Sequence, residues 1–134
     1  MPIKPENRTR YPANWKQIRQ RILLRANYRC EHTGCRAQHG VTGYWHGGRF
    51  VPMPDALWRA GAKVGHVIGC ADGGTIRIIK IVLTIAHLDH QPENCADDNL
   101  CAWCQRHHLA YDAEHHRLTA AATRRARANT LELF

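Results

Sequence analysis

Apolar side chains recur at helical spacing close to the N-terminus of the chain. Trp15, Ile18 and Ile22 lie along one stripe, while the lysine and arginines between them face away from it. Asn14 precedes the stripe and belongs to a residue type that commonly caps helices. The pattern therefore predicts a helix over residues 15–26, with one apolar face and one basic face.

Alternating apolar residues indicate a strand in the second half of the chain. Every second residue from position 79 to 85 is isoleucine or leucine, so these side chains share one face of a strand that begins near Thr75. A polar loop is predicted over residues 91–98. Asp98 at its end is suited to cap a helix, which we expect over residues 99–116.

The remaining segments are assigned from composition. Residues 1–12 contain three prolines and two arginines and are predicted to form a flexible basic arm. Residues 39–74 are rich in glycine and are interpreted as an insertion with short strands. A second helical stretch is predicted over residues 118–128. We expect a single α+β domain, residues 1–134, whose core lies at 75–116 between N- and C-terminal helices.

Charge and apolar runs restrict the partners of the chain. It has 19 lysines and arginines against 11 acidic residues, a formal net charge of +8. This excess favours a polyanionic partner such as duplex DNA, although a merely soluble basic surface is the alternative on charge alone. Apolar runs fall short of the roughly 18 residues of a membrane span. We expect a cytoplasmic protein without membrane contact, from a bacterial host or a phage, as a monomer or weak homodimer.

Three short strings hold groups that act on phosphates: AHLDH at 86–90, DDNL at 97–100 and CQRHH at 104–108. A phosphodiester needs a metal ion to neutralise its transition state, and Asp89 with His108 offers a sparse oxygen and nitrogen site. The reaction also needs a base that works near neutral pH, which suits His90. The amide of Asn99 is suited to hold that base in one orientation.

The stretch LTIAHLDHQPENCADDNLCAWCQRHHLAYD, residues 83–112, resembles the core of HNH endonucleases, particularly the small ones encoded by phages. The resemblance implies a ββα-metal (His-Me finger) core and DNA cleavage that leaves 5′-phosphate ends. It also implies that Asp89 and His108 hold the catalytic ion and that His90 is the general base. Asn99 is the motif asparagine. Such a mixed site accepts Mg²⁺, Mn²⁺, Co²⁺ or Ni²⁺.

Family members often carry a structural zinc ion between two cysteine knuckles. Cys30 and Cys35 form the first knuckle here, and Cys104 with His107 takes the place of the second, which implies a Cys3His zinc site. In a reducing compartment cysteines are thiols or zinc ligands rather than disulfides. A competing register remains, because Cys101 and Cys104 are themselves a Cys-x2-Cys pair. Counting from the motif asparagine favours Cys104 and His107.

Three other histidines and the function class remain open. His87 is either a phosphate contact in the cleft or a structural histidine at the sheet edge. His115 and His116 are expected as solvated residues at a helix end. The two candidate functions are a metal-dependent DNA endonuclease and a zinc-stabilised DNA-binding or adaptor module with weak catalysis. The presence of all four motif residues favours the endonuclease.

Overall fold

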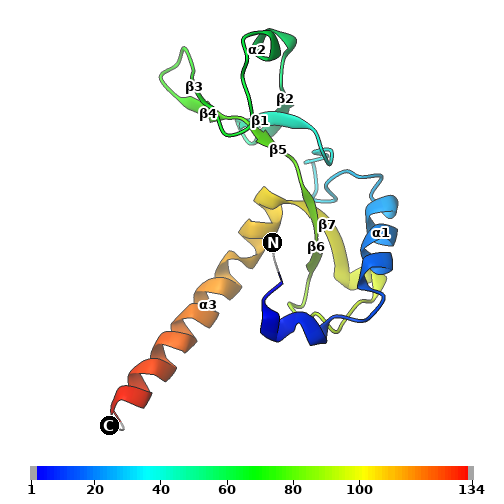
Figure 1. Cartoon of the computed structure of the whole chain (residues 1–134), viewed down its shortest axis with the longest axis vertical. Coiled ribbons are helices and arrows are strands. Elements are labelled where there is room, and N and C mark those ends of the chain that lie inside the picture. The colour runs from blue at the N-terminus through cyan, green and yellow to red at the C-terminus, as the bar shows by residue number, and fades with distance from the viewer. Residues whose placement is uncertain (1–2, 133–134) are drawn as a thin grey trace.

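The computed structural model describes residues 3–132 as a mixed α+β chain with three small antiparallel sheets (Figure 1). In chain order its elements are the 3-10 helix η1 (Pro5–Arg10), α1 (Trp15–Arg25), β1 (Thr42–His46), β2 (Arg49–Pro52), α2 (Asp55–Arg59), β3 (Val67–Gly69), β4 (Thr75–Arg77), β5 (Ile79–Lys80), β6 (Leu83–His87), the 3-10 turn η2 (Asp97–Asn99), β7 (Leu100–Cys104) and α3 (Gln105–Glu132).

The antiparallel pair β6 and β7 lies at the centre of the main apolar core. Leu83 pairs with Cys104 at one end, and His87 pairs with Leu100 at the other. Both strands are almost entirely buried. Helix α1 packs beside them, and α3 leaves directly from the end of β7 (Figure 1). The hairpin therefore holds two helices and the loop after β6 around one core.

Helix α1 forms where the apolar stripe predicted it. Ile18 and Ile22 are buried in the main core. Asn14 occupies the N-cap position, but the described structure shows no side-chain hydrogen bond from it to the helix. At the other end, Arg25 donates to the carbonyls of Asp97 and Leu100, each at 2.7 Å. These bonds fasten the end of α1 to the start of β7.

A lobe made of β1, β2, α2, β3, β4 and β5 lies above the central hairpin in Figure 1. β1 pairs with β2 and β5, and β3 pairs with β4. The lobe has a buried apolar cluster of its own: Met53, Ala62, Ile76 and Ile78. The glycine-rich segment 39–74 contributes short strands to it, as expected. The lobe extends to Lys80, beyond the predicted insertion, because β4 and β5 complete its sheets.

The strand predicted from Thr75 onward is broken into β4, β5 and β6. Ile76 and Ile78 are buried in the cluster of the lobe, whereas Ile81 and Leu83 are buried in the main core. The chain passes from one cluster to the other between them. In this crossing the alternation of buried side chains shifts by one residue, from positions 76 and 78 to positions 81, 83 and 85, and the strand changes its pairing partner.

The helix predicted over residues 99–116 was placed too early. Residues 97–99 form η2, and the next five residues are the strand β7. Pairing with β6 satisfies the backbone of β7 and buries Leu100 and Ala102 in the main core. Asp98 is therefore not a helix cap, and α3 begins at Gln105.

Helix α3 is continuous over 28 residues, where the sequence pattern predicted two helices. Its sequence contains no glycine or proline and includes three consecutive alanines at 120–122, so no residue interrupts the helix. At 1.5 Å per residue it is about 42 Å long. Its second half extends away from the rest of the molecule (Figure 1, orange to red). Among residues 3–132, no helix is both long and apolar enough to cross a membrane.

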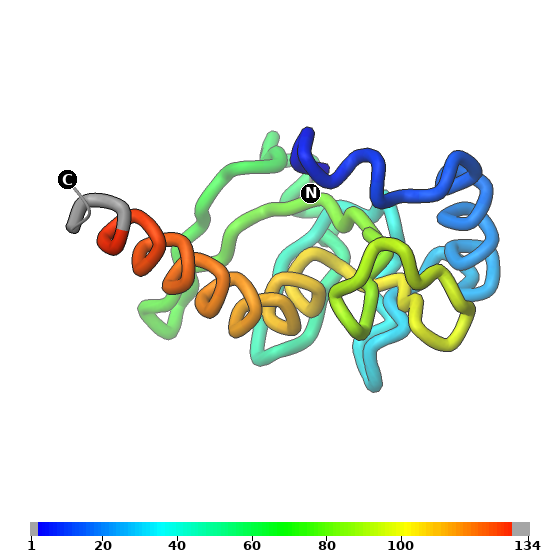
Figure 2. Tube along the Cα trace, turned by 90° about the horizontal axis from the view of Figure 1, so that it is seen from below, coloured from blue at the N-terminus to red at the C-terminus, as the bar shows by residue number. Residues whose placement is uncertain are grey.

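The N-terminal segment is structured where a flexible arm was predicted. Its first two residues lie outside the described range, but Pro5–Arg10 forms η1. Arg10 binds the Glu93 carboxylate at 2.5 and 3.1 Å and the Gln91 side chain at 3.0 Å. These contacts hold the segment against the loop that follows β6. Figure 2 shows the dark blue segment lying along one side of the molecule.

Candidate functional site

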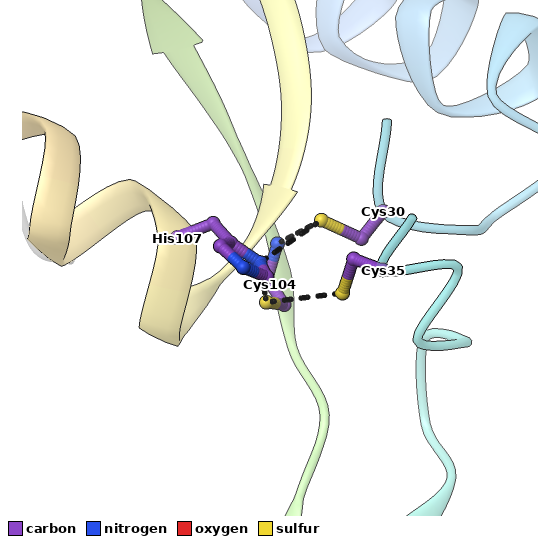
Figure 3. A group of neighbouring side chains, drawn as sticks. All are labelled: Cys30, Cys35, Cys104 and His107. Atoms are coloured by element: carbon purple, nitrogen blue, oxygen red, sulfur yellow. Dashed lines mark hydrogen bonds between the residues drawn. The ribbon is translucent and has the colours of Figure 1, made fainter. Parts of the chain in front are cut away.

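Two segments far apart in the sequence meet where β7 passes into α3 (Figure 3). Cys30 and Cys35 lie in the turn after α1, Cys104 ends β7, and His107 lies in the first turn of α3. Their ligand atoms all lie within 4.8 Å of one another. Within residues 3–132 this is the one group of three or more cysteine, histidine or acidic side chains with such geometry.

The separations in this group match the edges of a tetrahedral site. Cys35 Sγ lies 3.9 Å from Cys104 Sγ, and His107 Nδ1 lies 3.2 Å from Cys104 Sγ and 3.8 Å from Cys30 Sγ. Bonds of about 2.3 Å to zinc in a tetrahedron separate two sulfur atoms by about 3.8 Å. The four residues are therefore placed to hold a metal ion, consistent with structural zinc. The register with Cys104 and His107 is confirmed, and Cys101 is not a member of the group.

Neighbouring groups orient the ligands. The backbone N–H of Cys104 donates to Cys30 Sγ at 3.3 Å. The His107 ring stacks on His32, with centroids 3.9 Å apart and planes 7° apart. Trp45 of β1 meets the same ring edge-on at 5.9 Å. Contacts outside the ligand shell commonly fix the orientation of a metal-binding imidazole. The lobe thus packs directly against the metal ligand from α3.

Proximity and burial shift the pKa values of the three thiols. The hydrogen bond with Cys104, together with burial, raises the pKa of Cys30, and burial raises the pKa of Cys35. The hydrogen bond from Cys30 lowers the pKa of Cys104. A bound cation favours the thiolate forms, so metal binding at this site is coupled to the release of protons.

A cleft of about 700 Å³ lies between the N-terminal segment, β6 and α3. The N-terminal segment and α1 contribute basic and aromatic side chains to it: Lys4, Arg10, Tyr11, Trp15 and Arg19. The end of β6, the following loop and α3 contribute five histidines: His87, His90, His108, His115 and His116. Imidazoles that can exchange protons therefore share one cleft with cationic side chains that can bind an anion.

Asp112 joins two of these histidines through a buried carboxylate. Its Oδ1 lies 3.3 Å from His90 Nδ1, and its Oδ2 lies 3.0 Å from His108 Nε2. The other ring nitrogen of His108, Nδ1, lies 2.5 Å from the hydroxyl of Thr84 on β6. Burial lowers the pKa of His108, although Asp112 acts to raise it. One side chain of α3 thus connects the loop after β6 with the start of the helix.

The backbone and ring of His90 are both constrained. Its φ of +58° lies in the left-handed region, which few residues other than glycine adopt. Its ring is nearly parallel to those of His115, at 4.2 Å, and Tyr111, at 5.3 Å. Its side chain is 25% exposed. His115 is exposed, as expected, but it lies in the middle of α3 rather than at a helix end, and its ring stacks on His90. His116 is exposed and lines the same cleft.

Hydrogen bonds hold the Asp89 carboxylate within its own loop. It accepts from Asn94 Nδ2 at 2.8 Å, the Gln91 N–H at 2.9 Å and Asn99 Nδ2 at 2.9 Å. These bonds lower the pKa of Asp89 to about 2, with the bond from Asn94 the largest cause. Asn99 Oδ1 in turn accepts from the Asp89 N–H at 3.2 Å.

Two pairings expected from the sequence are replaced by others. Asn99 was expected to orient His90, but its amide binds the Asp89 loop, and the group facing His90 is Asp112. Asp89 was expected beside His108, but the carboxylate against His108 is also that of Asp112. The reason is that the loop after β6 satisfies Asp89 with its own amides.

His87 is packed against the N-terminal segment. It is buried, its ring stacks on Trp15 with centroids 5.2 Å apart, and Tyr11 meets it edge-on at 5.8 Å. Burial lowers the pKa of His87, which favours the neutral ring. These contacts agree with a structural histidine. Its contact with a phosphate stays a prediction.

Asp112 and Thr84 were not recognised from the sequence. Asp112 follows His108 by four residues, a spacing that places both side chains on one face of a helix, so a signal was present. Thr84 carries no comparable signal. Its contact with His108 exists because β6 lies beside the first turn of α3.

Comparisons of the chain with models of known protein families, with curated proteins and with solved structures found no match. The functional conclusion therefore rests on the residues and geometry described above.

Proposed function

We propose that this chain is a metal-dependent endonuclease of the HNH type, which hydrolyses phosphodiester bonds in duplex DNA. The observation that carries the proposal is a pair of imidazoles, His90 and His108, held by the buried carboxylate of Asp112 at the wall of an open cleft. His90 lies in the loop after β6, and His108 and Asp112 lie in α3. Two antiparallel strands followed by a helix, here β6, β7 and α3, are the element order of a ββα-metal core.

The distribution of positive charge favours DNA as the substrate. Lys4 and Arg19 line the cleft, and α3 carries exposed arginines along its length: Arg117, Arg124, Arg125 and Arg127. Because α3 starts beside the imidazole pair and is about 42 Å long, basic side chains extend well beyond the cleft. A long polyanion matches this distribution better than a small anion does.

His90 is the general base in this proposal. A partly exposed imidazole is the side chain best suited to accept a proton from water at physiological pH. His90 faces the cleft, and three residues of α3 hold its ring. The proton moves from the attacking water to the imidazole as the water oxygen bonds to phosphorus. The bond from phosphorus to the 3′-oxygen breaks, and this oxygen takes a proton from solvent to leave as a hydroxyl.

Asp89 and His108 are the proposed ligands of the catalytic ion, and a bound ion would take His108 Nδ1 in place of the Thr84 hydroxyl. A carboxylate and an imidazole suit Mg²⁺, Mn²⁺, Co²⁺ or Ni²⁺. Asp89 lies two residues after β6, and His108 lies in the first turn of α3. Asn99 supports Asp89 through two hydrogen bonds. When bound, the ion supplies Lewis-acid stabilisation of the charge on the scissile phosphate.

A second candidate is a zinc-stabilised DNA-binding or adaptor module with weak catalysis. Both ring nitrogens of His108 are engaged within the protein, by Thr84 and Asp112. The oxygens of Asp89 are likewise engaged by neighbouring amides. These contacts favour a site in which the motif residues serve packing.

A plasmid-nicking assay on the full chain separates the two candidates. The endonuclease converts supercoiled plasmid to nicked or linear DNA with Mg²⁺, Mn²⁺, Co²⁺ or Ni²⁺ and stops in EDTA. His90→Ala lowers the rate at least about 100-fold while DNA binding persists, and His46→Ala in the lobe is the matched control. Undiminished cutting in EDTA, or His90→Ala at the wild-type rate, contradicts the proposal. Binding without cleavage in all four metals supports the module.

A further inference from the structure

The Asp112 carboxylate determines which ring nitrogens carry hydrogen. A carboxylate can accept a hydrogen bond but not donate one, and its charge repels a bare nitrogen, so the imidazole nitrogen nearest each oxygen is the one that carries hydrogen. The facing nitrogens are His90 Nδ1, at 3.3 Å, and His108 Nε2, at 3.0 Å. A neutral imidazole has one N–H, which leaves His90 Nε2 and His108 Nδ1 as acceptors. The Thr84 hydroxyl lies next to His108 Nδ1, where it can donate.

Ring stacking alone cannot select a tautomer. His115 and Tyr111 lie nearly parallel to the His90 ring, at interplanar angles of 3° and 23°, and fix its plane. A stacked ring packs equally well with its hydrogen on either nitrogen or after a half-turn in its plane. A negative charge beside one nitrogen removes this ambiguity, because it attracts an N–H and repels a bare lone pair. Asp112 makes that contact, and Asn99 is engaged with Asp89.

The burial of the Asp112 carboxylate is poorly explained by a contribution to folding stability. Asp112 is 9% exposed, and the side chains that face it are two imidazoles rather than an arginine or a lysine. Burying a carboxylate against neutral partners costs free energy. Glu114, two residues later on the same helix, is exposed and lies near Arg117. The placement of Asp112 therefore points to a task at the imidazoles.

We propose that Asp112 is a positioning residue that holds His90 in the Nδ1–H tautomer, so that Nε2 is the nitrogen that takes a proton from water. The inference rests on the proposed endonuclease function for its consequence, since a base needs a bare nitrogen that faces its substrate. It assigns to Asp112 the orienting role that the sequence suggested for Asn99.

Long-range ¹H–¹⁵N correlation spectra of the full zinc-loaded chain test the tautomer without any activity. At a pH of about 8.5, where imidazoles are neutral, they distinguish Nδ1–H from Nε2–H rings. We expect wild-type His90 as Nδ1–H and His108 as Nε2–H. Asp112→Asn should change the tautomer of His90 or mix the two forms, because an amide both donates and accepts. The matched control Glu114→Gln should leave both rings unchanged.

Nicking kinetics of the same variants test the consequence. Asp112→Asn should lower kcat at least about tenfold, as expected when a base loses the group that sets its tautomer, with KM for DNA unchanged. Asp112→Glu, which keeps the acceptors, should recover part of the rate. Glu114→Gln should cut at the wild-type rate.

Three results overturn the inference: wild-type His90 as the Nε2–H tautomer, an unchanged Nδ1–H ring in Asp112→Asn, or wild-type kcat in that variant. If Asp112→Asn does not fold, the wild-type spectrum still decides the tautomer. If the wild-type chain cuts no DNA with any metal, the proposed function fails, and the role of Asp112 in catalysis falls with it. The spectra show separately whether Asp112 sets the tautomer.

Discussion

Asn99 and Asp89 hold each other through two hydrogen bonds across the loop that follows β6. The Asp89 N–H donates to Asn99 Oδ1 at 3.2 Å, and Asn99 Nδ2 donates to Asp89 Oδ1 at 2.9 Å. Asn99 is 9% exposed, and its Nδ2 also donates to the carbonyl of Asn94. The pair joins the two ends of the loop and holds the backbone next to His90.

Removal of the Asn99 amide should destabilise the folded chain. Asn99→Ala removes three part-buried hydrogen bonds, two with Asp89 and one with the Asn94 carbonyl, which should lower the free energy of unfolding by about 1–3 kcal/mol. Urea denaturation measures this change. Asn94→Ala is the matched control, because the exposed Asn94 also donates to Asp89. Equal losses from the two variants would contradict a special role for the buried amide.

Asp89 should contribute to the acid sensitivity of folding. Hydrogen bonds lower its folded-state pKa to about 2 from the ordinary 3.8. Ionised Asp89 therefore stabilises the fold above about pH 4, and this contribution is lost as the pH falls through about 2. Asp89→Asn should show a shallower fall in unfolding free energy across this window than wild type and Asp98→Asn. Zinc release in acid affects all three chains alike. Parallel profiles would contradict the prediction.

Zinc should be required for the full stability of the chain. A structural zinc site contributes binding free energy on the order of 10 kcal/mol to folding. His107→Ala should lower zinc content and melting temperature together, since it removes the ligand from α3. Cys101→Ser, on the same strand as Cys104, should be nearly silent in both measurements. Loss of zinc from Cys101→Ser but not from His107→Ala would move the site to the other register.

The backbone of His90 should favour glycine over alanine once the imidazole is removed. At φ of +58°, a β-carbon costs roughly 1 kcal/mol that glycine avoids. His90→Gly should therefore unfold at higher urea than His90→Ala, although both variants lose the proposed base. Equal or reversed midpoints would show that the left-handed conformation is not retained in the variants.

The exposed arginines of α3 should contribute to the salt dependence of DNA binding. Each phosphate contact adds about 0.9 to the slope of log K against log salt. Replacing Arg124, Arg125 and Arg127 together by alanine should reduce that slope by about 2 to 3. Arg59→Ala in the lobe is the control and should leave the slope near wild type. An unchanged slope in the triple variant would place the DNA away from this part of α3.

Short-range sequence patterns predicted an element correctly where contacts between residues close in sequence determine its structure. The stripe of Trp15, Ile18 and Ile22 predicted α1, because helical spacing alone brings these side chains to one face. The resemblance to HNH endonucleases implied Cys104 and His107 as the second half of the metal site, and these two residues lie one turn apart where β7 passes into α3.

Strand β7 and the continuity of α3 depended on context that a short sequence window does not contain. Residues 99–104 are compatible with a helix by pattern, but pairing with β6 makes them a strand. The helical pattern was divided near residue 117 although no residue there ends a helix. A strand forms where a partner supplies its hydrogen bonds, and that partner lies elsewhere in the chain.

The sequence alone singled out Asp89, His90, Asn99 and His108 as candidate residues for phosphodiester cleavage, and their role stays a prediction. The tertiary structure alone decided which of them touch. His90 meets Asp112, 22 positions later, and Asp89 meets Asn99, because the β6 loop closes on itself while α3 returns beside it. Hydrogen bonds act over about 3 Å, so such partners follow from the packing of α3 against the hairpin rather than from spacing along the chain.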